Sequence, residues 1–290
     1  MLVIDYRRMD SLPIAVRFLG PASRGSSLPG FFQCDNGQEY LIKFNAPSMN
    51  RLLFNEYIVY HLAETLGLPI PKGEIIDIHP FLWNNERFLA GRNISKVFGF
   101  EKIVIVDNIN SDNSFKMSWP KFIKGAKNKN LIPDILVFDM WISNCDRAGL
   151  GNNYGNLVMN NKGELNIIDH SHALGGVRDT QERTNNLTDP LNCQFFTEGP
   201  IPSSLASQIY PDGSKNPFQS IISRINSIGF SDIQAIVNTA ANFWGINTAE
   251  SVLVAEFLEK RKPLLQQYID YLVYPKGYFI NWEGRPLIWI

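Results

Sequence analysis

The sequence lacks the features that would place it among disulfide-rich, secreted or membrane-spanning proteins. Its 290 residues contain only three cysteines, Cys34, Cys145 and Cys193, and no CxxC pair. An odd number of cysteines without close spacing argues against a disulfide framework and against a cysteine-ligated zinc site. No uncharged apolar stretch reaches the ~18 residues of a membrane span, and residues 1–10 do not follow the order of a signal peptide. We therefore expect a cytoplasmic protein that does not contact a membrane.

The sequence also has no excess of charge of either sign. Lys and Arg number 27 and Asp and Glu number 28, which gives a net charge of −1. This balance argues against direct nucleic-acid binding and against a polybasic membrane-binding surface. Hydrophobic residues make up 44% of the chain, which is enough for a sizeable core. At ~100–200 residues per domain, the length allows one large domain or two lobes.

The first part of the chain is predicted to be rich in strands. Short apolar runs predict strands at residues 13–19, 31–34, 40–44, 74–82 and 101–106. The turn signal Asp35-Asn36-Gly37 makes residues 31–44 a hairpin. Before this hairpin lies a loop, residues 20–30, that is dense in Gly, Ser and Pro. A helix should begin with Asn50 as its cap and end near Gly67.

The remainder of the chain is predicted to be mainly helical. A polar break at residues 107–116 is the best candidate for a boundary between two lobes. Beyond it, Pro133 can start a helix, and apolar runs at 156–159 and 165–168 predict a hairpin. Helical periodicity covers residues 217–228, 231–243 and 249–273, the last with a kink expected at Pro263. A second small hairpin is expected within residues 277–290.

A carboxylate interrupts the apolar face of the helix that follows residue 50. That face consists of Leu52, Val59, Ala63 and Leu66, with Glu56 among them at the same helical spacing. A buried carboxylate needs a partner, and Lys43 in the preceding strand can supply it. The alternative is that Lys43 keeps its head in water and that Glu56 lies at the edge of the stripe.

A second group of polar residues has the order of a phosphotransfer site. Asp146 and Arg147 end a helix, Asn156 directly precedes a strand, and Asp169 closes the next apolar run. In such a site Asp146 would orient or deprotonate an acceptor hydroxyl. Asn156 and Asp169 would hold Mg²⁺, a hard cation that takes oxygen ligands. Helix capping and turn formation are the alternative roles of these residues.

This order of elements resembles the HipA-like kinases, a bacterial branch of the kinase fold that is also similar to phosphatidylinositol 3- and 4-kinases in its catalytic loop. The matching segments are YLIKF, NEYIVYHLAETLGLPIP, FDMWISNCDR, NLVM, IIDHSHAL and EFLEKRKPLLQQYID. The resemblance covers roughly residues 12–272. It implies an α+β, two-lobed protein-kinase-like fold. Residues 1–107 would form a β-rich N-terminal nucleotide-binding lobe, and residues 108–290 a mainly helical C-terminal catalytic lobe.

The resemblance also implies roles for individual residues. Lys43 would contact the phosphates of ATP and pair with Glu56. Asp146 would be the catalytic base, and Asn156 and Asp169 would bind Mg²⁺. ATP and Mg²⁺ are accordingly the expected cofactors.

The loop at residues 20–30 is where a nucleotide-covering loop should lie. Gly20, Gly25 and Gly30 do not have GxGxxG spacing, and the loop is not a Walker A motif. Its backbone N–H groups can still cradle phosphates, although a plain surface loop is an equal alternative. By the resemblance, Ser26 and Ser27 are candidates for nucleotide contact. Together with Ser23 they are also candidates for autophosphorylation.

Two departures from the family pattern bear on activity. Ala148 stands where the family often has His after Asp-Arg, and the separation between Asp146 and Asn156 is longer than usual. The inserted residues include Asn152 and Asn153, either of which can replace Asn156 as a metal ligand.

The favoured function is ATP- and Mg²⁺-dependent phosphoryl transfer to a hydroxyl, foremost Ser or Thr of a protein. The resemblance extends this to a toxin-type kinase that autophosphorylates and has an antitoxin-like protein partner. One alternative is a small-molecule or lipid kinase, or a nucleotidyl transferase, on the same fold. Another is a pseudokinase that acts as a nucleotide-binding module, which Ala148 and the long loop favour.

Overall fold

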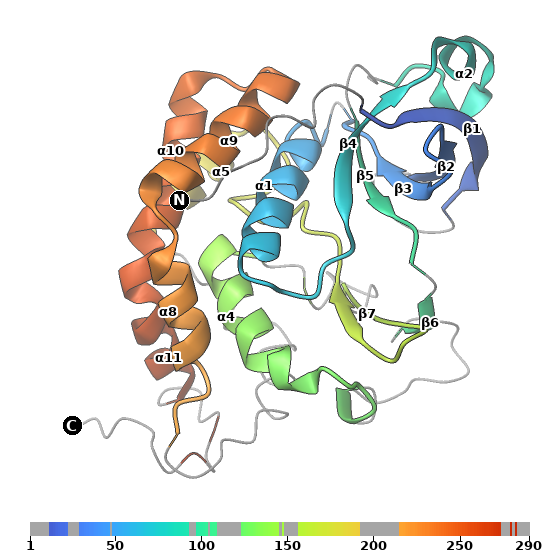
Figure 1. Ribbon diagram of the computed structural model, residues 1–290. Coiled ribbons are helices and arrows are strands. Elements are labelled where there is room, and N and C mark those ends of the chain that lie inside the picture. Colours follow the sequence, from blue (N-terminus) through green and yellow to red (C-terminus); the bar gives the residue numbers. More distant parts are fainter. Residues whose placement is uncertain are drawn as a thin grey trace.

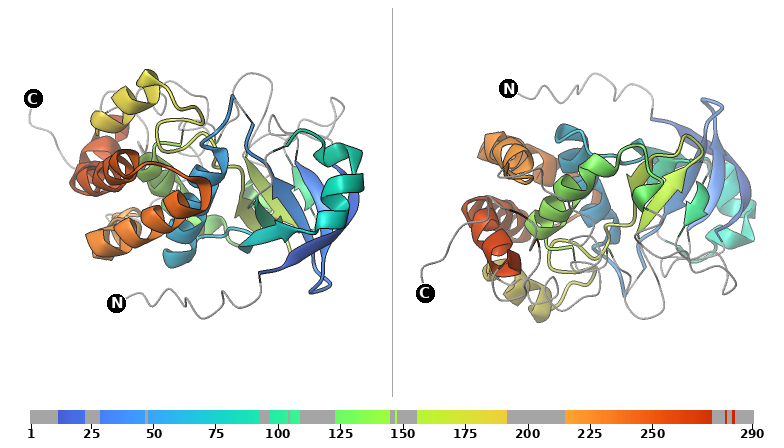
Figure 2. Two further views of the ribbon diagram at one scale, coloured as in Figure 1. Left: turned by 90° about the horizontal axis from the view of Figure 1, so that it is seen from above. Right: turned by 90° about the horizontal axis from the view of Figure 1, so that it is seen from below.

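The protein combines strands in its N-terminal part with helices in its C-terminal part, as expected for a mixed α+β fold. The computed structural model describes residues 12–22, 29–46, 48–92, 97–103, 105–108, 123–144, 147, 156–191, 215–273, 279 and 282. The strands are β1 (Ile14–Pro21), β2 (Gly30–Cys34), β3 (Glu39–Lys43), β4 (Gly73–Ile78), β5 (Val97–Glu101), β6 (Ile105–Asn108), β7 (Leu157–Asn160) and β8 (Leu165–Ile167). The helices are α1 (Leu52–Thr65), α2 (Pro80–Asn85), α4 (Ile132–Ile142), α5 (Gln181–Thr188), α8 (Gln219–Ser227), α9 (Phe230–Trp244), α10 (Thr248–Arg261) and α11 (Leu265–Val273). The barrel end and the end with α8–α11 lie on opposite sides of α1 and α4 (Figures 1 and 2).

The first five strands form a closed barrel in the order β1-β2-β3-β5-β4. All its pairs are antiparallel except β1 with β4. Because successive side chains of a strand point to opposite faces, Tyr40 and Ile42 of β3 fill the barrel with Phe32 and Phe44. Lys43 alternates to the outer face of the same strand. The hairpin predicted over residues 31–44 is therefore present, and it delivers Lys43 to the side of the barrel that α1 covers.

Helix α1 is buried on nearly all sides. On one side Tyr60 packs against Phe98 of β5, with ring centroids 5.6 Å apart. The ring of Tyr57 also lies 5.7 Å from Phe98, and it lies 5.9 Å from Phe243 and 5.7 Å from Trp244 at the end of α9. A helix that is apolar all round belongs in the interior. The packing thus fixes α1 between the barrel and the C-terminal helices, as Figure 1 shows.

A second sheet, with the order β6-β7-β8, lies beside the barrel. β7 and β8 form the hairpin predicted at residues 156–168, and the register pairs Leu157 with Ile167. The N–H of Ile168 donates to the carbonyl of Asn156 at 3.0 Å, which extends the ladder by one step. Asn156 and Asp169 consequently lie at the same end of this hairpin.

Several local predictions were wrong. The strand expected over 74–82 ends at Ile78, because Pro80 opens α2 and the Nδ1 atom of His79 accepts from the N–H of Phe81 at 3.2 Å. The strand expected over 101–106 is divided between β5 and β6. Asn50 does not cap α1: Arg51 occupies that position, and the Asn50 side chain accepts from the N–H of Asp179 at 3.0 Å.

The C-terminal helices follow the predicted periodicity closely. The kink expected at Pro263 is a short 3₁₀ turn, Lys262–Leu264, between α10 and α11. Helix α5 was not predicted, because its sequence QERTNNLT has no apolar period. None of the helices in the described ranges combines the length and apolarity needed to cross a membrane. The division into lobes at residue 107 stays a prediction.

The interface between α1 and the barrel predicts a large stability difference between two phenylalanines. Phe98→Ala should lower the free energy of unfolding by about 3–5 kcal/mol, because Phe98 is fully buried and its loss leaves a cavity. Phe81→Ala is the control, because Phe81 is 65% exposed and should change stability by about 0.5 kcal/mol or less. Urea denaturation of both variants measures the difference. Equal losses would contradict the packing.

Candidate active site

A buried ion pair joins the barrel to α1. The Nζ atom of Lys43 lies 2.5 Å from the Oε1 atom of Glu56, so the two side chains that the sequence paired are in contact. Glu56 is fully buried and Lys43 nearly so. Burial raises the pKa of Glu56 to about 7, even though Lys43 acts to lower it. Burial alone would lower the pKa of Lys43, but the carboxylates of Asp169 and Glu56 raise it above its ordinary value.

Asp169 is the second acid at this lysine. Its Oδ1 atom lies 2.8 Å from the Nζ atom of Lys43 and also accepts from the Ser171 hydroxyl at 3.0 Å. Asp169 has a φ of 53°, a backbone conformation uncommon for residues other than glycine. Burial would raise the pKa of Asp169, but Lys43 holds it well below its usual range. The Asp169 side chain is 35% exposed, so one ionised carboxylate of the site remains open to solvent.

Asn156 and Asp169 bring two oxygen donors to one end of the β7–β8 hairpin. An amide oxygen and a carboxylate oxygen are ligands that Mg²⁺ accepts, and Mg²⁺ usually keeps several waters or phosphate oxygens. Among the described residues no cluster of three His, Cys, Asp or Glu side chains could hold a metal ion. Asn156 and Asp169 therefore remain candidate ligands for such a cation.

Arg147 anchors this end of the hairpin to α4. Its guanidinium forms a bidentate ion pair with Asp139, with Nε 2.8 Å from Oδ2 and Nη2 2.9 Å from Oδ1. Its Nη1 atom donates to the carbonyls of Asn156 and, at 3.1 Å, of Ile168. Sequence reasoning gave Arg147 no such role. The available signal was Asp139, an acid inside the apolar run of α4 just as Glu56 is inside α1.

His170 connects the two buried ion pairs. Its Nε2 atom lies 2.8 Å from Nη2 of Arg147, and because a guanidinium only donates, Nε2 accepts and the proton lies on Nδ1. Burial, with the positive charges of Arg147 and Lys43, keeps the pKa of His170 well below its ordinary value. The backbone N–H of His170 donates to Oε1 of Glu56 at 3.0 Å. The segment around Asp169 is therefore held from both α4 and α1.

The structure brings Lys43, Glu56 and Asp169 into direct contact and places Asn156 at the same end of the hairpin as Asp169. The remaining predicted site residues lie outside the described residues: Asp146, Ser26, Ser27, Asn152 and Asn153. Their flanks are described. Ala22 and Pro29 close the base of the predicted nucleotide loop through a 2.9 Å hydrogen bond.

A basic side chain shared by two acids, one of which is also a candidate metal ligand together with Asn156, is the kind of site that phosphotransferases use. The family model for HipA-like kinases matches residues 15–188, more than half of the 290 residues. The matched region includes Lys43, Glu56, Asp146, Asn156 and Asp169. The chain therefore belongs to the HipA-like kinase family.

Solved structures show distant similarities. A Helicobacter pylori proinflammatory kinase, CtkA, is 13% identical, with 84% of this chain and 91% of that chain covered and a TM-score of 0.47. A Golgi casein kinase with Mn and ADP bound is 12% identical, with 88% and 72% covered and a TM-score of 0.36. The open conformation of CtTel1 is 12% identical, with 98% and 13% covered and a TM-score of 0.39. No curated protein sequence matches the chain.

The Lys43–Glu56 contact predicts strong coupling between the two residues. Lys43→Ala leaves the buried Glu56 carboxylate without its opposite charge and should cost about 3 kcal/mol of stability. Glu56→Ala should cost less, because Lys43 keeps Asp169 as a partner at 2.8 Å. The double variant should be little worse than the worse single variant, because both changes break the same contact. Denaturant unfolding of the four proteins gives the coupling free energy.

The matched control for this cycle is the ion pair between Glu39 and Lys102. Both of its side chains are more than two-fifths exposed, so their coupling should be about 1 kcal/mol or less. If the stability losses of Lys43→Ala and Glu56→Ala simply add, the two residues are not energetically coupled. If the Lys43–Glu56 and Glu39–Lys102 pairs show equal coupling, burial gives the Lys43–Glu56 pair no extra coupling.

Proposed function

We propose that this HipA-like kinase transfers the γ-phosphoryl group of ATP, in the presence of Mg²⁺, to a hydroxyl group, foremost that of Ser or Thr in a protein. The observation that carries the proposal is Lys43, which is buried and held between Glu56 and Asp169 at 2.5 and 2.8 Å. Fixed charges of this kind stabilise the charge that develops on a transferred phosphoryl group without reorganising during the reaction.

Each residue of the site has a distinct role in the proposal. Lys43 binds phosphate oxygens of ATP, and Glu56 keeps its ammonium group in place. Asp169 and Asn156 hold Mg²⁺, which when bound would neutralise charge on the β- and γ-phosphates. The partial exposure of Asp169 and the fully buried Oε2 atom of Glu56, which has no hydrogen-bond partner, support a site completed by ligands.

Asp146 is the proposed base that orients the acceptor hydroxyl and takes its proton. Its neighbours support this role. Asn144 donates from Nδ2 to Oδ1 of Asp139 at 2.9 Å, and Arg147 pairs with the same carboxylate. The chain on both sides of Asp146 is thus anchored to one buried acid on α4.

The loop at residues 20–30 completes the proposed nucleotide site. Ser26 and Ser27 would contact phosphates, and with Ser23 they are the proposed positions of autophosphorylation. A toxin-type role in the cytoplasm with an antitoxin-like protein partner is the extended form of this proposal. Acceptors other than protein hydroxyls, such as a small molecule or a lipid, would use the same residues.

A nucleotide-binding protein without catalysis is the second candidate function. The observation that favours it is Ala148, together with the insertion that separates Asp146 from Asn156. Incubation with γ-labelled ATP and Mg²⁺, followed by mass spectrometry of the protein itself, separates the two candidates. Label on the protein favours the kinase, whereas bound nucleotide without label favours the second candidate.

Asp146→Asn should nearly abolish phosphoryl transfer. A positioned base contributes ~10²–10⁴-fold to rate, and the amide cannot accept the hydroxyl proton. ADP binding and thermal unfolding should stay close to those of the unchanged protein. Transfer of label from γ-labelled ATP to the protein measures the rate, and turnover equal to that of the unchanged protein would show that Asp146 is not the base.

Asp169→Ala should remove the Mg²⁺ dependence of nucleotide binding, because the carboxylate supplies the charge of the proposed metal site. Asn156→Ala should weaken it less, because an amide oxygen is a neutral ligand. Calorimetry of ADP binding with and without Mg²⁺ measures the effect of each variant. The same affinity gain from Mg²⁺ in Asp169→Ala and the unchanged protein would exclude Asp169 as a ligand. A larger loss at Asn152 or Asn153 would move the second ligand into the insertion.

A further inference from the structure

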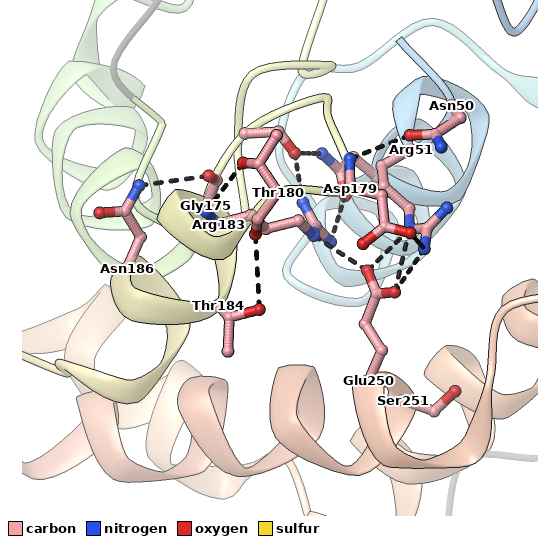
Figure 3. A network of polar contacts seen from close by, with 12 residues as sticks. Asn50, Arg51, Gly175, Asp179, Thr180, Arg183, Thr184, Asn186, Glu250 and Ser251 are labelled. Atoms are coloured by element: carbon pink, nitrogen blue, oxygen red, sulfur yellow. Dashed lines mark hydrogen bonds and ion pairs between the residues drawn. The ribbon is translucent and has the colours of Figure 1, made fainter. Parts of the chain in front are cut away.

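Glu250, in the first turn of α10, joins two arginines that are far apart in the sequence (Figure 3). Its carboxylate pairs with Arg51 at the start of α1, with Oε1 2.8 Å from Nε and Oε2 2.7 Å from Nη2. Its Oε1 atom also lies 3.0 Å from Nε of Arg183 on α5. Glu250 lies beyond residue 188, where the match to the family model ends.

Both arginines hold the segment that follows Asp169. Arg183, which is 3% exposed, donates from Nη1 to the carbonyl of Gly176 and from Nη2 to Oδ1 of Asn55 at 3.2 Å. The backbone N–H of Arg51 donates to the carbonyl of Val177 at 2.9 Å. Glu250 therefore holds Arg51 and Arg183 in place, and these two arginines bind one end of the segment.

Asn55 holds the other end of the segment. Its Nδ2 atom lies within hydrogen-bond distance of three backbone carbonyls, those of Ser171 at 2.7 Å, Ala173 at 2.9 Å and Gly176 at 3.0 Å. Because Arg183 donates to its Oδ1 atom, the Asn55 amide has one orientation in which all these contacts are made. The next residue of α1 is Glu56, so one turn of α1 holds both Lys43 and the segment after Asp169.

The backbone of residues 171–176 adopts a conformation that has to be stabilised by its surroundings. Leu174, Gly175 and Gly176 have φ values of 54°, 81° and 114°, all in the left-handed region. A residue with a side chain, such as Leu174, is strained there and stays in that conformation only when its surroundings enforce it. The contacts from Asn55 and Arg183 contribute to this, together with the N–H of Leu174, which donates to the carbonyl of Ile142 at 2.9 Å. Loss of the Arg183 and Asn55 contacts would loosen the segment next to Asp169.

We propose that Glu250 is a positioning residue for Asp169, which acts through Arg183 and Asn55 on residues 171–176. The role that it supports in Asp169 rests on the proposed function, whereas the anchoring of the segment does not. Burial lowers the pKa of Arg183 to about 10 even with Glu250 beside it, so the Glu250 carboxylate stabilises a charge that is costly to bury. Arg51 also pairs with Asp179 at 2.8 Å, but Glu250 is the acid that contacts both guanidinium groups. Without its charge the attraction that holds Arg183 at Gly176 would weaken.

Asp134 supplies a matched control for Glu250. Both acids have side chains that are 12% exposed, and both pair with an arginine on another helix, Asp134 with Arg224. Arg224 also donates to the carbonyl of Leu66, away from the segment after Asp169. Glu250→Gln and Asp134→Asn thus both replace a carboxylate of equal exposure by an amide, and only Glu250 pairs with arginines that bind the segment after Asp169.

The experiment compares these two variants by amide hydrogen exchange of residues 169–179 without nucleotide, and by calorimetry of ADP binding over a series of Mg²⁺ concentrations. Glu250→Gln should accelerate exchange in this segment by ~10-fold and raise the half-saturating Mg²⁺ concentration by a similar factor, while ADP affinity without Mg²⁺ is unchanged. Asp134→Asn should change either quantity by less than ~2-fold. Glu250→Asp keeps the charge and should recover most of the difference between Glu250→Gln and the unchanged protein. If Glu250→Gln does not fold, Glu250→Asp is measured in its place.

Equal effects of Glu250→Gln and Asp134→Asn on exchange in residues 169–179 would overturn the proposal, because Glu250 would then act on global stability alone. Faster amide exchange in this segment together with an unchanged half-saturating Mg²⁺ concentration would overturn the link to Asp169. The unchanged protein could transfer no phosphate while Glu250→Gln, unlike Asp134→Asn, still changes both amide exchange and the Mg²⁺ dependence. In that case the proposed function fails and the positioning role of Glu250 stands.

Discussion

A fully buried carboxylate has to be compensated, and the compensation of Glu56 determines how the parts of this protein meet. Lys43 from β3 supplies the opposite charge, and the N–H of His170 supplies a hydrogen bond to the same oxygen atom. The barrel, α1 and the segment after β8 are thereby joined at one carboxylate. Since an unpaired buried charge costs several kcal/mol, these three parts cannot separate without losing much of the stability of the fold.

The same arrangement, an acid on a helix that pairs with a basic side chain from another segment, occurs twice more in the helical part of the chain. Asp139 on α4 pairs with Arg147, and Glu250 on α10 pairs with Arg51 and Arg183. In each case a helix contributes an acid with little exposure, and an arginine bound to it, Arg147 or Arg183, donates to the backbone of a loop. Loops that carry chemistry need a rigid support. Here that support is electrostatic as well as apolar, because the acids that hold the arginines are themselves fixed within packed helices.

Sequence reasoning found the residues that violate a local pattern. Glu56 stood out because it interrupts an apolar helical stripe, and Asp169 because it directly follows a strand of a recognisable hairpin. Glu250 did not stand out, because an acid in the first turn of a helix is ordinary in any sequence. Its partners lie 199 residues away at Arg51 and 67 residues away at Arg183, and no periodicity encodes such distances. Helix α5 was missed for a related reason, because its few buried contacts leave no apolar pattern.

The packing of α1 also determines when the site is assembled. Because α1 is enclosed between the barrel and α9, packing within the fold orders both side chains of the Lys43–Glu56 pair, and the entropy of ordering them is lost on folding. Lys43 at the same time contacts Asp169, the most exposed of the three residues. Under the proposed function a phosphate that approaches Lys43 competes with Asp169 for one ammonium group. The Asp169 oxygen released in that exchange becomes available to a cation, so phosphate and metal would bind more favourably together than either does alone.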